Sequence, residues 1–257
     1  MLRVLIWPLI GIVSIALTIL IFFPATWLGS LLEIQTAGRL TLGDAQGTLW
    51  HGSAFVGAAP SSNDPVTPLL PGRFVWQLSP AFLLGRVDAV IDNTASLSHQ
   101  IKITGDWNQW QVSPSMITLP AERLAALGAP LNTIKPSGRM NLSWQLLQLT
   151  LQKETVEMTG VIKLELKDIA SRLSPIKPLG AYELLFDWHG KHADMKLKTV
   201  EGPMLLSGSG KINNGRLQFS GTAQAAAGHE EKLANLLNLL GQRRQQGGKE
   251  IISLEFK

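Results

Sequence analysis

The sequence predicts a mainly β protein: a single N-terminal transmembrane helix followed by an antiparallel β-rich region, a curved sheet or a sandwich, with two short helices. Three observations predict this fold class. Residues 4–23 are uncharged and strongly apolar. After them, apolar residues mostly alternate with polar ones, as in half-buried strands. Gly, Pro, Asn and Ser interrupt the alternating stretches at short intervals, which is typical of strands joined by tight turns.

The composition narrows the class further. Of 257 residues, 45% are hydrophobic and 16% are charged, which excludes an intrinsically disordered chain. The absence of cysteine excludes disulfides, iron–sulfur clusters, cysteine-type zinc sites and a catalytic thiol. The net charge is +4, and the one tight basic pair is Arg243–Arg244. Because nucleic-acid-binding proteins usually carry a clustered basic face, we expect no nucleic-acid partner.

The apolar N-terminal segment is long enough to be a membrane anchor. Val4–Phe23 contains no charged residue, and about 20 apolar residues in a helix cross a hydrocarbon layer of ~30 Å. A cleaved signal peptide has a shorter apolar region of ~7–15 residues, and Pro24–Thr26 is a poor cleavage site. Trp7 and Trp27 stand near the two ends of the segment, where indole rings favour the membrane interfaces. We therefore expect an uncleaved signal anchor that contacts membrane lipid through residues 4–23.

The orientation of this anchor follows from the positive-inside rule. Arg3 precedes the apolar segment, and the next basic residue is Arg39. We expect the N-terminus in the cytoplasm and the C-terminal region outside it. In a bacterium with two membranes, this places a single-pass protein in the bacterial cell inner membrane with its C-terminal region in the periplasm.

The first half of the β-rich region is predicted to contain eight strands: Arg39–Leu42, Thr48–Val56, Arg73–Leu78, Val87–Ile91, Ser98–Thr104, Trp110–Val112, Gly138–Leu146 and Leu147–Gln152. Gly43–Gly47 is rich in turn-forming residues and is expected to end the first strand. Ala58–Pro71 contains several Pro and Ser residues and is expected to form a mobile loop. Pro120–Leu127 begins with proline and precedes Gly128, which predicts a short helix.

The second half alternates more regularly, with strands predicted at Val156–Leu166, Ala181–Trp188, Ala193–Val200, Pro203–Ile212 and Arg216–Ala223. His189–His192 is expected to form a turn, and Asn213–Gly215 is a strong hairpin signal because Asn and Gly tolerate a positive φ. Glu230–Leu240 has acidic residues in its first turn and four leucines on one face, which predicts an amphipathic helix. Arg243–Lys249 is expected to be a polar tail, and Ile251–Phe256 a last edge strand.

Each predicted short helix follows a run of strands, which suggests a duplicated unit. The expected divisions are a cytoplasmic N-terminus (1–3), the transmembrane signal anchor (4–23), a first periplasmic β-rich half (24–152) and a second half ending in a short helix and tail (153–257).

The search for catalytic or metal-binding motifs yields no site. His189 and His192 have a spacing found in metal sites, but they lie on a predicted turn without further ligands. Gly208–Lys211 is similar to the end of a phosphate-binding loop, but the required Gly and Ser or Thr are replaced by Leu205 and Ile212. No GxSxG motif is present. We therefore predict no catalytic, cofactor-binding or metal-binding residue, no cofactor, and no small-molecule substrate; the binding residues are left unassigned.

Binding functions remain open. Trp107 and Trp110 flank a predicted turn, where they either pack against the sheet or form a binding platform. Exposed strand edges pair readily with strands of partner proteins. A curved sheet with an apolar inner face would alternatively hold acyl chains.

Several segments, taken in order with the N-terminal anchor, resemble one protein family. These segments are Gly47–Gly52 (GTLWHG), Lys177–Gly180 (KPLG), Glu201–Gly210 (EGPMLLSGSG), Gly215–Gly221 (GRLQFSG) and Leu236–Gly241 (LLNLLG). Together they are similar to the N protein family of bacterial type II secretion systems. The resemblance implies a non-enzymatic, periplasm-facing accessory component of the inner membrane that supports export of folded proteins across the outer membrane.

Two functions from different classes follow. In the first, the protein contacts other inner-membrane proteins of the secretion system. In the alternative, it is a lipid-handling envelope protein whose β half-pipe carries phospholipid. A lipid carrier needs a continuous apolar trough, whereas an assembly component needs a packed core and an exposed patch or open edge.

Overall fold

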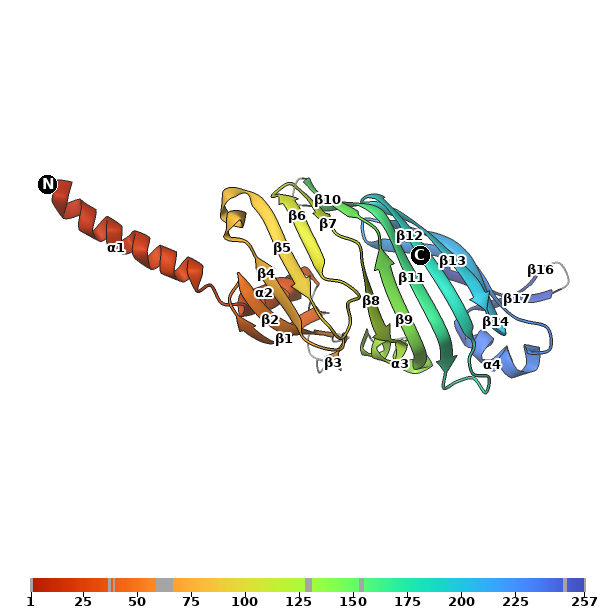
Figure 1. Ribbon diagram of the computed structural model, residues 1–257. Coiled ribbons are helices and arrows are strands. Elements are labelled where there is room, and N and C mark those ends of the chain that lie inside the picture. The colour runs from red at the N-terminus through yellow and green to blue at the C-terminus, as the bar shows by residue number, and fades with distance from the viewer. Residues whose placement is uncertain are drawn as a thin grey trace.

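The computed structural model shows one extended antiparallel sheet with a long helix projecting from one end (Figure 1). The structure describes residues 2–36, 38, 40–58, 67–127, 131–152, 155–246 and 249–256. The α-helices are α1 (Leu2–Ile21), α2 (Thr26–Gln35), α3 (Leu131–Ile134) and α4 (Glu230–Leu240), and two 3-10 helices are η1 (Pro80–Leu84) and η2 (Ala121–Leu127). The mainly β antiparallel fold predicted from the alternating pattern is confirmed.

The helix α1 is 20 residues long, and it leads into α2 at the first strands of the sheet (Figure 1). In α1 the structure describes side chains from Gly11 onward. Among the described residues, no helix is both long and apolar enough to cross a membrane. The transmembrane anchor therefore stays a prediction.

The strands of the first half are β1 (Leu40–Gly47), β2 (His51–Ala58), β3 (Thr67–Pro68), β4 (Phe74–Leu78), β5 (Arg86–Asp92), β6 (Ile101–Asp106), β7 (Gln109–Val112), β8 (Ser115–Pro120), β9 (Pro136–Trp144) and β10 (Leu147–Gln152). Those of the second half are β11 (Thr155–Ser171), β12 (Gly180–Gly190), β13 (His192–Glu201), β14 (Met204–Asn213), β15 (Arg216–Ala225), β16 (Gln242–Gln246) and β17 (Lys249–Phe256). Sequential strands pair as an antiparallel meander, which keeps their connections short.

The long strand β11 joins the two halves. Its first part pairs with β10, its second part pairs with β9, and β12 lies along its other side. The sheet is therefore hydrogen-bonded across the division expected at residues 152 and 153, and the division into two halves remains a prediction.

The alternating sequence gives the sheet one apolar and one polar face. Between β12 and β13, Phe186 lies opposite Met195, whereas Glu183 lies opposite Lys198 on the other face. The amphipathic helix α4 covers the apolar face of the last strands, where Leu233, Leu236 and Leu237 are buried. The resulting core also contains Leu179, Tyr182, Met195, Met204, Phe219, Ala223, Ile252 and Leu254.

Several boundary predictions in the first half were wrong. Gly43–Gly47 does not end the first strand, because its turn-forming residues make a bulge: the register shifts between Gly43 and Gln46, and Asp44 has a φ of 49°. The predicted loop at 58–71 lies largely outside the described residues. The strand β8 and the helix α2 were not predicted, and the helix expected at Pro120–Leu127 is the 3-10 helix η2, with Pro120 ending β8.

Two predictions near the C-terminus also need correction. The segment expected to be a polar tail forms β16 through residue 246. As a result β17 is not an edge strand, because it pairs with β15 on one side and β16 on the other. The helix at Glu230–Leu240 and the hairpin turn at Asn213–Gly215 are confirmed, with positive φ at Asn214 and Gly215.

Candidate functional site

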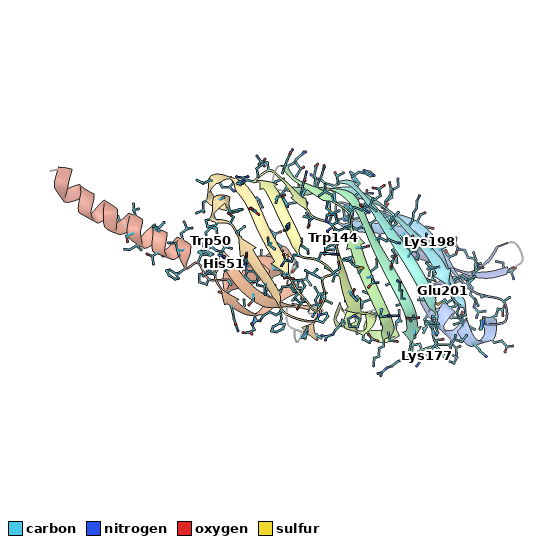
Figure 2. The ribbon with its side chains drawn as sticks, viewed as in Figure 1. Trp50, His51, Trp144, Lys177, Lys198 and Glu201 are labelled. Atoms are coloured by element: carbon cyan, nitrogen blue, oxygen red, sulfur yellow. The ribbon has the colours of Figure 1, made fainter. Side chains whose placement is uncertain are left out.

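The turn between β1 and β2 joins α1 to the sheet. The carbonyls of the last helical turn have no partner within the helix, and Trp50 Nε1 donates to one of them, the Leu20 carbonyl, at 2.8 Å. The backbone N–H of Leu49 donates to the Phe23 carbonyl at 2.8 Å. The backbone N–H of Ala25 donates back to the Gly47 carbonyl at 3.2 Å. Figure 2 shows Trp50 and His51 at this junction, where α1 meets the sheet.

Two glycines make this turn possible. Gly47 has a φ of 88°, a conformation that favours glycine. A Cβ atom at Gly52 would overlap the indole ring of Trp76, whose Nε1 donates to the Leu49 carbonyl at 3.1 Å. The segment Gly47–Gly52 is thus a connector that fixes the end of α1 to the first strands.

Replacing Trp50 by phenylalanine tests this connector. An aromatic ring smaller than indole is retained, but the Leu20 carbonyl loses its donor. We expect the free energy of unfolding to fall by about 0.5–1.5 kcal/mol, measured by urea denaturation of the detergent-solubilised full chain with circular dichroism. The control is Trp27→Phe, since Trp27 is exposed. Equal changes in both variants would contradict a specific role for the Trp50 hydrogen bond.

Two further segments meet in the second half of the chain. The KPLG segment contains Leu179. Its backbone N–H donates to the Ile169 carbonyl at 2.6 Å, and its carbonyl accepts from the Met204 N–H at 2.9 Å. Gly180 and Gly202 lie so close together that a Cβ on Gly202 would overlap the Cα of Gly180. KPLG and the EGPM start of the next segment therefore lie side by side, and they close one end of the core under α4. Figure 2 labels Lys177 and Glu201 near this place.

The buried Tyr182 forms a further hydrogen bond where these two segments meet. Its hydroxyl donates to the Met204 carbonyl at 3.0 Å. Burial raises the pKa of this phenol well above its usual range, so the hydroxyl keeps its proton and its hydrogen bond.

The SGSG segment of β14 accommodates an aromatic ring. A Cβ on Gly208 would overlap the ring of Phe219, and one on Gly221 would lie 2.8 Å from it. Only residues without side chains leave room for the ring to lie flat on the apolar face here. Gly208–Lys211 therefore belongs to a sheet interior and not to a phosphate-binding loop.

A charged cluster lies on the polar face of β11–β13. Glu165 and Glu183 are directly opposite each other, which would be destabilising without a cation between them. Lys163 Nζ lies 2.7 Å from Glu165 and 2.9 Å from Glu183, and Lys198 Nζ lies 2.7 Å from Glu183. These hydrogen bonds hold the pKa of both carboxyl groups below their usual value and raise the pKa of Lys163.

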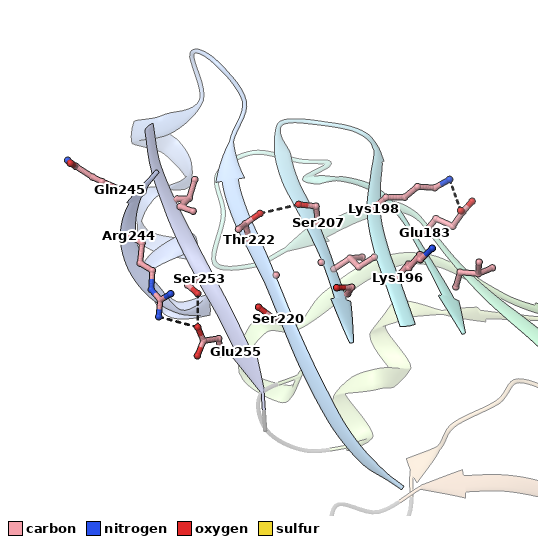
Figure 3. Close-up of a pocket in the computed structure, with 16 residues that line it drawn as sticks. Glu183, Lys196, Lys198, Ser207, Ser220, Thr222, Arg244, Gln245, Ser253 and Glu255 are labelled. Atoms are coloured by element: carbon pink, nitrogen blue, oxygen red, sulfur yellow. Dashed lines mark hydrogen bonds and ion pairs between the residues drawn. The ribbon is translucent and has the colours of Figure 1, made fainter. Parts of the chain in front are cut away.

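A shallow groove of about 890 Å³ runs beside the cluster across β12–β17 (Figure 3). Small polar side chains form its middle, with Ser207 Oγ and Thr222 Oγ1 3.0 Å apart. Charged side chains stand at its two ends: Glu183 and Lys198 at one, and the Arg244–Glu255 ion pair, 3.1 Å long, at the other. Such a surface offers hydrogen-bonding groups of both charges to a protein partner but does not enclose a small molecule.

The charged cluster predicts a pH dependence. Because the pKa of Glu183 is lower when the chain is folded, its ionised form adds stability above its ordinary value of 4.5, and this is lost as the pH falls below that value. We expect Glu183→Gln to reduce the stability lost between pH 7 and pH 3.5, by no more than about 1 kcal/mol because the pairs lie at the surface. The measurement is urea denaturation at both pH values, with Glu201→Gln as a control outside the cluster. An unchanged pH dependence in Glu183→Gln would contradict the role of the cluster.

The comparison with protein families decides the identity. A model of the type II secretion system (T2SS) protein N matches residues 38–251. The chain belongs to the type II secretion system protein N family. No characterised protein sequence and no solved structure is found to match it.

All five segments that carried the resemblance lie inside the region matched by the protein N family. The structure gives all five a scaffold role. The first fixes α1 to the sheet, the next two meet at Leu179 and Met204, the fourth supplies the core residue Phe219, and the last belongs to the core helix α4. The segments that carried the resemblance to the protein N family are therefore explained by packing and backbone geometry.

The remaining sequence candidates have separate environments. His189 and His192 face each other across the β12–β13 turn, His189 near Asp187 at 3.2 Å and His192 near Asn213 at 2.8 Å. Within the described ranges, no group of three or more His, Cys, Asp or Glu residues is arranged to hold a metal ion. Trp107 and Trp110 do not form one platform: Trp107 packs on Phe82, whereas Trp110 pairs within the sheet.

Sequence reasoning missed the charged cluster and the Trp50 contact. Lys163, Glu165 and Glu183 are ordinary polar residues of alternating strands, and their meeting depends on the strand register. The Trp50 contact had a usable signal, since a tryptophan within a turn, flanked by two glycines, is placed to contact something outside its own hairpin.

Proposed function

We propose that this protein is a non-enzymatic, inner-membrane component of a type II secretion system that supports export of folded proteins by contacting other components of the machine. The family match over residues 38–251 carries this proposal. The polar groove and the charged cluster support a role in protein contacts, because they present a solvated surface backed by a packed core.

The proposed location rests on α1. Its sequence is uncharged from Val4 onward, and the side chains of Ile12, Ile15 and Ile19 are exposed. Apolar side chains on all sides are typical of a helix in lipid. Arg3 favours a cytoplasmic N-terminus and a periplasmic sheet.

The exposed strand β16 is the proposed edge for a partner. It lies outside β17 and reaches away from the body of the sheet in Figure 1. Edge strands pair with strands of other chains, and Arg243 and Arg244 on β16 would limit this pairing to partners that tolerate or match their charge.

One observation favours a second candidate, binding of acyl chains. The apolar face of β5–β7 and β10 carries half-buried residues such as Ile91, Ile103, Trp110 and Leu149 in neighbouring registers. Against it, α4 fills the apolar face of the last strands with a packed core, so the apolar surface does not continue as an open trough along the whole sheet.

Deleting the chain from its secretion system tests the proposed function. We expect the secreted folded enzymes to leave the cell more slowly and to accumulate in the periplasm, and the full chain supplied in trans to restore export. Unchanged export in the deletion strain would contradict the proposal.

A further inference from the structure

The 3-10 helix η1 forms an apolar tip beside the end of α1. Ser79 caps η1 by accepting from the Ala81 N–H, and Gly85 ends it with a φ of 87°. The short element projects two leucines: Leu83 is half-exposed and Leu84 is 89% exposed. Trp107 lies next to them, half-exposed, with its ring 6.2 Å from that of Phe82.

The position of η1 relative to α1 gives the depth of η1 relative to the proposed membrane. Pro80 and Leu83 line a mainly apolar cavity of about 480 Å³ together with Leu17, Leu20 and Ile21 of α1, and Thr48 and His51 complete its lining. Leu17 lies six residues before Phe23, the last residue of the apolar segment, which corresponds to roughly 9 Å along a helix axis. If α1 crosses the membrane as proposed, η1 is level with the last turns of α1 that lie in lipid.

The chemistry of the tip suits this depth. Trp107 Nε1 donates to the Phe82 carbonyl at 2.7 Å, so its one polar atom needs no water. Indole rings favour the boundary between headgroups and hydrocarbon. Arg86 and Asp106, which are paired in the register of β5 and β6, border the tip: Arg86 follows Gly85 and Asp106 precedes Trp107.

We infer that η1 and Trp107 form a second membrane contact, which inserts into the headgroup–hydrocarbon boundary of the periplasmic leaflet beside α1. This inference rests on the proposed membrane anchor. Insertion at two places would fix the tilt of the sheet relative to the membrane, and the connector at Trp50 would transmit that fixed geometry from α1 to the first strands.

The test uses the absence of cysteine in the chain. Single-cysteine variants Leu84→Cys, Ile15→Cys and Leu239→Cys of the full chain carry a nitroxide label and are reconstituted into nanodiscs of phosphatidylethanolamine and phosphatidylglycerol. All three side chains are exposed, so the label does not disturb the core. Electron paramagnetic resonance then compares collisions of each label with oxygen, which concentrates in lipid, and with a water-soluble nickel chelate.

We expect the label at position 84 to collide preferentially with oxygen, as at position 15, and the label at 239 to collide preferentially with nickel. A label at 84 that behaves like the one at 239, while position 15 remains in lipid, would overturn the second contact and leave the anchor standing. Nickel preference at position 15 would overturn the anchor and the second contact together.

Discussion

Replacing Leu233 by alanine is expected to lower the free energy of unfolding by about 2–5 kcal/mol. Leu233 is fully buried, and it lies in the core between α4 and the apolar face of β12–β15 and β17. Removing the side chain loses the burial of its carbon atoms and leaves a cavity that the surrounding strands fill only in part. The measurement is urea denaturation of the detergent-solubilised full chain.

Leu239→Ala is the matched control, because Leu239 lies on the same helix but is 68% exposed. Both substitutions change helix propensity equally, so the difference between them reports burial alone. We expect Leu239→Ala to stay within about 0.5 kcal/mol of the unmodified chain. A similar loss of stability in both variants would show that α4 does not hold the core together.

Placing two charges in α1 is expected to remove the protein from the membrane fraction. Val13 and Leu17 lie near the middle and in the second half of the apolar segment. Each carboxylate in a helix near the bilayer centre costs about 2.5–3.5 kcal/mol of insertion free energy. The double variant Val13→Asp, Leu17→Asp should therefore be released from cell membranes by alkaline carbonate, whereas the unmodified chain should stay in the pellet.

The control for this prediction is Leu239→Asp, which adds a charge at an exposed leucine outside α1 and should leave the protein in the pellet. Release of the unmodified chain by carbonate, or retention of the double variant, would contradict the proposed anchor.

The sequence predicted strand alternation well because each strand has one buried and one solvated face. In β13 the side chains of Met195 and Leu197 alternate with Asp194, Lys196 and Lys198, and this pattern indicates both the strand and its apolar face. The amphipathic helix α4 was equally predictable from the sequence, since its leucines share one side and glycine follows its last residue.

The errors occurred where the same residues serve two purposes. Asp44 and its neighbours signal a turn, but tertiary pairing with β2 uses their conformational freedom for a bulge inside a strand. The segment around Arg243 is polar enough to be a tail, yet β17 supplies a partner that makes it a strand. In both cases the deciding contacts are distant in sequence.

For the candidate surfaces, too, some features could be predicted from the sequence and others could not. The five segments that identified the family could be found in the sequence, but most of their residues turn out to shape the scaffold. The groove beside Lys198 and the apolar tip at Leu84 depend on which strands become neighbours, so they could be found only in the structure.

The most direct test of the assembly function is photo-crosslinking in living cells. A photoreactive amino acid is placed at Gln218 or Lys198 on the polar face, and at Trp110 on the apolar face as a comparison. We expect Gln218 and Lys198 to capture identified inner-membrane components of the type II secretion system. Capture of phospholipid at Trp110, with no secretion component captured at Gln218 or Lys198, would contradict the assembly function and favour lipid handling.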